Sequence, residues 1–231
     1  MAELILALDV PHGAAALGLL DRLADVRWVK VGSVLFTREG PELVRELVVE
    51  RSLQVFLDLK WHDIPNTVAE AVAGARDLGV SMATLHLVGG SAMMRAASDA
   101  AGRDLALVGV TVLTSHDATS YSRAVGRADV DLDHEVVRLA GEASHAGLAG
   151  VVCSPREIAL VRGVLGEGAR IVVPGIRRSR DAVGDQVRIA SAAEAAAAGA
   201  THLVIGRPIL QSEDPAAAFG EFLAEAQCAG S

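Results

Sequence analysis

Short hydrophobic segments rich in β-branched residues recur along the chain, and each is followed by a segment with helical periodicity. This alternation predicts repeated βα units around a parallel sheet, because strands covered by helices on both faces are apolar along most of their length. Eight such segments are distinguishable, at residues 4–10, 28–33, 54–60, 82–87, 106–114, 150–154, 170–175 and 202–206.

The carboxyl ends of these segments are polar or glycine, unlike the segments themselves. They carry Asp9, Lys30, Asp58 with Lys60, His86, Thr114, Ser154, Gly175 with Arg177, and Gly206 with Arg207. Eight parallel strands with polar carboxyl ends are typical of a (β/α)8 TIM barrel, whose active site lies at that face. The alternative is a doubly wound open sheet, but the first strand is followed by DVPHG and not by the dinucleotide motif G-x-G-x-x-G. We therefore predict one α/β barrel domain over residues 1–231.

Composition and charge narrow the classes of function. The chain is 51% hydrophobic and 22% charged, which is too apolar for a disordered protein and too interrupted by charge for a membrane protein. A net charge of −8 disfavours a nucleic-acid partner. The apolar N-terminal run is broken by Asp9, and Cys153 and Cys228 have neither disulfide-framework nor metal-type spacing. We expect a soluble, cytoplasmic protein without a membrane partner.

The densest group of candidate catalytic residues lies at the end of the third predicted strand. Because side chains alternate along a strand, Asp58 and Lys60 project to the same side, into the barrel mouth. Alone, such a pair is an ordinary strand-end salt bridge. Asp9 and Lys30 end neighbouring strands, however, and Asp63 follows in the next loop. Alternating charges on one face are costly to desolvate unless a ligand or a reaction uses them.

A second group of residues suits an anion. Arg177 and Arg207 follow the seventh and eighth strands together with glycines, where barrels commonly bind phosphate. Residues 177–186 lack apolar periodicity and are predicted to form a loop that closes on the ligand. Arg178 and Arg180 in this loop are expected to be solvent-exposed.

These motifs resemble one family, the orotidine 5'-phosphate decarboxylases, over the whole chain. The string D-x-K-x-x-D-I-P-N-T is highly specific, and the matching segments follow in family order at 7–10 (ALDV), 29–32 (VKVG), 58–67 (DLKWHDIPNT), 110–115 (VTVLTS), 174–177 (PGIR), 185–186 (DQ) and 204–208 (VIGRP). The departures are small. Gly184 stands where a second Asp is usual, Val112 where Gln is frequent, and residues 190–192 lack the usual Thr-Pro.

The resemblance implies cofactor-free decarboxylation of orotidine 5'-monophosphate to UMP, the final step of pyrimidine biosynthesis, with no metal. It makes Lys60 the proton donor to C6 and places Asp58 against the leaving carboxylate. It also implies a homodimer in which Asp63 and Thr67 reach the partner subunit's site. The remaining contacts to the nucleotide are implied for Asp9, Lys30, Thr114, Gln186, and, around the phosphate, Arg177, Gly206 and Arg207.

The roles of the histidines and two alternative functions remain to be considered. His62 belongs to the motif but is expected to support the loop, and His86 is expected to be structural. The other histidines share no metal spacing. The main alternative is a Mg2+-dependent sugar-phosphate decarboxylase or hexulose-phosphate synthase, whose D-x-K-x-x-D motif lacks the following Ile-Pro-Asn-Thr. A noncatalytic nucleotide-binding barrel is a further alternative, disfavoured by the costly charge cluster.

Overall fold

The predicted barrel is confirmed by a computed structural model, which describes residues 1–178 and 189–228. Its strands form a closed sheet in sequence order, with every neighbouring pair parallel. The strands are β1 (Glu3–Ala7), β2 (Trp28–Gly32), β3 (Gln54–Trp61), β4 (Met82–His86), β5 (Ala106–Val110), β6 (Gly150–Val152), β7 (Arg170–Val173) and β8 (His202–Ile205).

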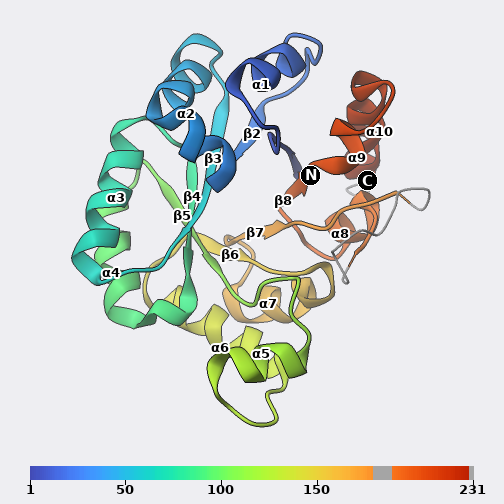
Figure 1. Ribbon diagram of the computed structural model, residues 1–231. Coiled ribbons are helices and arrows are strands. Elements are labelled where there is room, and N and C mark those ends of the chain that lie inside the picture. Colours follow the sequence, from blue (N-terminus) through green and yellow to red (C-terminus); the bar gives the residue numbers. More distant parts are fainter. Residues whose placement is uncertain (179–188, 229–231) are drawn as a thin grey trace.

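Helices surround this sheet and cover its outer face (Figure 1). They are α1 (Gly13–Leu20), α2 (Ser33–Arg45), α3 (Pro65–Asp77), α4 (Gly90–Ala101), α5 (Ala118–Val125), α6 (Leu132–His145), α7 (Ile158–Leu165), α8 (Ala192–Ala197), α9 (Arg207–Leu210) and α10 (Pro215–Cys228). Within the described part of the chain, no helix is both long and apolar enough to cross a membrane.

The buried apolar residues form two separate cores. The larger core lies between the strands and the surrounding helices, and Leu57 of β3 belongs to it. The smaller one fills the interior of the barrel and comprises Ile5, Ala7, Trp28, Phe56, Met82, Val108, Val172 and Val204. This apolar filling closes the barrel from below, so that polar side chains from the strand ends are left to meet above it.

Several strands end earlier than predicted, including β1 at Ala7 and β7 at Val173. β5 stops at Val110, so Thr114 lies in the connection to α5 and not on a strand. Ser154 begins a short helix, η3 (Pro155–Glu157), where its backbone N–H donates to Glu157 at 2.8 Å in a capping box. Arg207 is the first residue of α9. These residues therefore belong to the segments that follow the strands.

Candidate functional site

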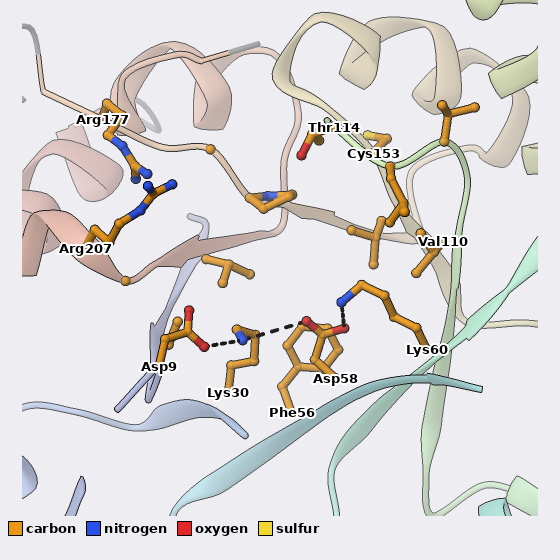
Figure 2. Close-up of a pocket in the computed structure, with 18 residues that line it drawn as sticks. Asp9, Lys30, Phe56, Asp58, Lys60, Val110, Thr114, Cys153, Arg177 and Arg207 are labelled. Carbon is orange, nitrogen blue, oxygen red and sulfur yellow. Dashed lines mark hydrogen bonds and ion pairs between the residues drawn. The ribbon is translucent and has the colours of Figure 1, made fainter. Parts of the chain in front are cut away.

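Four charged side chains of alternating sign form a continuous row at the carboxyl end of the barrel. Lys30 of β2 lies between two carboxylates, with its Nζ atom 2.8 Å from Asp9 Oδ1 and 3.8 Å from Asp58 Oδ2. The other oxygen of Asp58, Oδ1, accepts a hydrogen bond of 2.8 Å from Lys60 Nζ. The structure brings these four residues together, and Figure 2 shows them along one side of a cavity.

Burial makes this row more than a set of surface ion pairs. The side chains of Lys30 and Asp58 are 11% and 14% exposed, whereas Lys60 retains 35% and faces the cavity. Buried charges are costly unless each is paired, which the alternation of sign achieves here. Lys30 and Lys60 are also the only lysines in the sequence, all other cationic side chains apart from histidine being arginines. Both lysines of the sequence therefore lie in this row.

The cavity beside this row has a volume of about 240 Å³. Its lower wall comes from the interior core of the barrel, including Phe56 and Val204. Thr114 lies on the opposite wall beside Cys153, in the upper part of Figure 2. The cavity is thus polar along one side and apolar beneath, which suits a small, partly polar ligand.

Two arginines line the other end of the cavity. Arg177 follows β7, is only 6% exposed and donates from its guanidinium to the carbonyl of Ile176 at 2.8 Å. In Figure 2 it lies together with Arg207 at the end of the row where Asp9 is found. Two guanidinium groups at the mouth of a barrel provide a suitable site for an anion such as phosphate.

Gly206 allows the chain to pass close to this end of the row. Its backbone angles are φ −121° and ψ −94°, outside the usual regions for residues with a side chain. A Cβ atom here would lie 3.3 Å from both Ala7 Cβ and Asp9 Oδ2. A side chain at this position would therefore crowd Asp9 and the cavity.

Arg178 does not behave as predicted. It was expected to be a solvent-exposed loop charge, yet its side chain is only 12% exposed. It donates to Glu221 of α10 at 2.7 Å and lies over the ring of Phe222. The physical reason is that α10 supplies a carboxylate and an aromatic face that local sequence does not reveal. Arg180 lies outside the described residues.

Two other predicted site residues, Asp63 and Thr67, do not line the cavity in this chain. Asp63 and Thr67, in the segment that connects β3 to α3 and in the first turn of α3, are exposed to solvent. Asp63 Oδ1 accepts a hydrogen bond from the adjacent Ile64 N–H at 2.7 Å. Gln186 lies outside the described residues, as does most of the predicted loop at 177–186.

His86 and His62 do not line the cavity. Their ring centroids are 5.9 Å apart. Burial lowers the pKa of His86 below its ordinary value, and the nearby His62 and Lys60 lower it further. The lowered pKa means that His86 gives up its proton more readily than an exposed histidine does.

Two residues at this site were missed as contributors by sequence reasoning. Cys153, for which the sequence analysis proposed no role at the site, is 1% exposed and lines the cavity. Thr84 of β4 is completely buried and hydrogen-bonds both Asp58 and the backbone of Lys60. Strand alternation places Thr84 on the same inner face as Met82 and His86, but Thr84 lies within the strand and not at its end.

Over residues 1–178 and 189–228, no cluster of three His, Cys, Asp or Glu side chains could hold a metal ion.

A closed parallel barrel with a charged row and paired arginines at its carboxyl end defines a class of barrel suited to phosphorylated small molecules. Residues 2–222 match the model of the "Orotidine 5'-phosphate decarboxylase / HUMPS family". The chain belongs to this family.

Relatives and a solved structure agree with the family assignment. The chain is 50% identical to the orotidine 5'-phosphate decarboxylase of Halorhodospira halophila, over 99% of this chain and 97% of that protein. It is 52% identical to the corresponding protein of Alkalilimnicola ehrlichii, with 94% and 93% covered. The crystal structure of orotidine 5'-phosphate decarboxylase from Lactobacillus acidophilus superposes with a TM-score of 0.86 at 32% identity, covering 98% of this chain and 99% of that one.

Proposed function

We propose that this chain decarboxylates orotidine 5'-monophosphate to UMP without a cofactor, as one domain in the cytoplasm. The observation that carries the proposal is the row Asp9–Lys30–Asp58–Lys60 beside a cavity whose far end holds two arginines. The names of the relatives support the same reaction. The family description also includes the HUMPS group, so the relatives' names, rather than the family model, favour the decarboxylase over the sugar-phosphate alternative.

The order of side chains along the cavity orients the nucleotide. The phosphate binds Arg177 and Arg207 beside Gly206, because guanidinium groups bind phosphate oxygens with paired hydrogen bonds. Asp9 and Lys30 then meet the ribose hydroxyls, and the pyrimidine reaches Asp58 and Lys60 at the opposite end. Thr114 contacts the base from the other wall, and Gln186 is assigned a further nucleotide contact.

Lys60 supplies the essential chemistry in this arrangement. The bond between C6 and the carboxylate breaks, CO2 leaves, and the electron pair remains on C6. That carbanion is poorly delocalised, and the Lys60 ammonium stabilises it by charge before transferring a proton to C6. The resulting neutral amine regains a proton from solvent. Because Asp58 fixes the ammonium before the substrate arrives, little reorganisation is needed during the reaction.

Asp58 also faces the carboxylate that leaves. Two like charges in a partly buried cavity repel each other, and this repulsion is relieved when CO2 departs. Asp58 is 14% exposed and already paired with Lys60 and Lys30, so it remains a fixed negative charge beside the substrate. In this proposal the main role of Asp58 is to hold the two lysines in place, and its repulsion of the substrate carboxylate is a second contribution to the rate.

The proposed enzyme is a homodimer with shared sites. Asp63 and Thr67 are exposed next to Ile64, which is itself 66% exposed and offers apolar surface to a partner. A two-fold partner seated on this segment would bury Ile64 and receive Asp63 at its own charged row. This arrangement would complete a network of two lysines and two aspartates with Asp63 of the other chain.

The test of the proposed function is the loss of orotidylate absorbance when the purified protein is added. We expect turnover at an unchanged rate in excess EDTA, with UMP as the product. Activity on orotidylate that disappears in EDTA and returns with Mg2+ would contradict the cofactor-free mechanism. Binding of UMP without any turnover would favour the noncatalytic barrel.

A further inference from the structure

The edge between β3 and β4 is irregular at the catalytic row. Leu57 pairs with Ala83, but the next pair is Trp61 with Leu85, so three residues of β3 lie opposite the single residue Thr84. Lys60, at the end of this bulge, has a φ of 54°, a left-handed conformation that is uncommon for a residue with a side chain. Such a conformation persists only where the surroundings hold it.

Thr84 provides the contacts that hold it. Its Oγ1 atom accepts a hydrogen bond of 2.9 Å from the backbone N–H of Lys60, which the bulge removes from the regular strand pairing. The same hydroxyl donates to Asp58 Oδ1 at 3.0 Å. A hydroxyl has one proton to donate, so the bond to Asp58 uses that proton, while an oxygen lone pair accepts from Lys60.

Asp58 Oδ1 is also the atom that accepts from Lys60 Nζ. Thr84, Asp58 and Lys60 therefore form a closed set of hydrogen bonds in which one buried hydroxyl fixes the main chain of Lys60 and the carboxylate that orients its ammonium. Thr84 is 0% exposed and is not part of the cavity wall. It is positioned to act on the reaction through the other two residues, without touching the nucleotide.

We propose that Thr84 is a positioning residue that sets the Lys60 ammonium for proton transfer to C6. This role rests on the proposed decarboxylation. Misplacing a catalytic group by about 1 Å can cost on the order of 100-fold in rate. Removing the hydroxyl should therefore lower kcat while leaving nucleotide binding almost unchanged.

The test compares Thr84→Val, which preserves shape but lacks the hydroxyl, with Thr84→Ser, which keeps it. Thr111→Val is the matched control, because Thr111 is also buried in the barrel but its hydroxyl donates only to the carbonyl of Val152 at 3.0 Å. We expect Thr84→Val to lose about 10- to 100-fold in kcat, with the Kd for UMP within about threefold of wild type. Thr84→Ser and Thr111→Val should keep kcat within about threefold.

A second readout does not depend on turnover. Because the chain has only two lysines, isotope-labelled lysine gives two side-chain ammonium signals, which Lys60→Arg and Lys30→Arg assign. Thr84→Val should shift the Lys60 signal, and Thr111→Val should leave it in place. If wild type has no activity on orotidylate, the proposed function fails, and this spectrum still decides whether Thr84 positions Lys60.

Two results would overturn the role of Thr84. One is an unchanged kcat and an unmoved Lys60 signal in Thr84→Val. The other is an equal loss of kcat in Thr84→Ser and Thr84→Val, which would assign the effect to packing. If Thr84→Val does not fold, Thr84→Cys replaces it, because a thiol donates and accepts hydrogen bonds only weakly.

Discussion

Lys60 Nζ lies 2.8 Å from Asp58 Oδ1, and both residues belong to β3, with one residue between them. Two residues along a regular strand span roughly 6.5 Å, so side chains that share a face do not meet automatically. Here the bulge in β3 and the left-handed conformation of Lys60 accompany the contact. The acid and the base are thus held together before any ligand binds.

Substitution of Lys60 should abolish turnover without disturbing the fold. We expect Lys60→Ala to lower kcat by several orders of magnitude, because the residue both stabilises the carbanion and donates the proton. Lys60→Arg should be nearly as inactive, since a guanidinium keeps the charge but does not release a proton near neutral pH. Steady-state kinetics measure the loss, and circular dichroism checks the fold. A variant within tenfold of wild type removes Lys60 from this role.

Arg207 should discriminate nucleotides from nucleosides. We expect Arg207→Ala to weaken binding of UMP by about 10- to 100-fold and to leave uridine almost unaffected, as a lost charge-assisted contact to phosphate predicts. Calorimetry with both ligands measures the difference. Arg178→Ala is the control, because the Arg178 side chain is held by Glu221 and Phe222 of α10. An equal loss for UMP and uridine would refute the phosphate contact.

The barrel and the charged row could be predicted from the sequence, because both follow from the periodic pattern of apolar and polar residues. The period of two along a strand predicted that Asp58 and Lys60 share one face, and they meet there although the bulge interrupts the regular pairing of β3. The sequence did not predict Thr84, because the bulge that needs its hydroxyl has no glycine or proline to signal it. It was wrong for Arg178, whose partner Glu221 is 43 residues away and reaches it only through packing. Contacts between distant segments are the part that local patterns do not contain.

Acid should destabilise the protein through Glu135 on α6. Hydrogen bonds from Arg138, Arg127 and Tyr121 lower the pKa of this carboxyl from 4.5 to about 2, against the opposing effect of burial. A pKa that is lower in the folded state gives stability at pH values above the unfolded pKa, and this stability is lost as pH falls from about 4.5 to about 2.

Glu135→Gln tests this linkage. We expect the variant to be clearly less stable than wild type at pH 7, because two arginines lose their carboxylate. The difference should narrow as the pH is lowered below about 4.5, since wild type loses the same contribution by protonation. Glu70→Gln, at an exposed position on α3, is the control and should show a small, pH-independent difference. Urea titrations at several pH values measure both, and a gap for Glu135→Gln that stays constant down to pH 3 would contradict the assignment.

Sharing of the site between subunits is tested by mixing two inactive variants. Lys60→Ala and Asp63→Asn should each be nearly inactive as homodimers, because each removes a member of the proposed network. In a mixed dimer, one site contains both defects, while the other combines intact Lys60 of one chain with intact Asp63 of its partner. Random exchange between equal amounts makes half of the dimers mixed, so activity should recover to about a quarter of wild type. Thr114→Val mixed with Lys60→Ala is the control. Thr114 lines the cavity of its own chain, so each site of this mixed dimer carries one of the two substitutions and no site is intact. If verified exchange gives no recovery for Asp63→Asn, the residue acts within its own chain or the protein does not form this dimer.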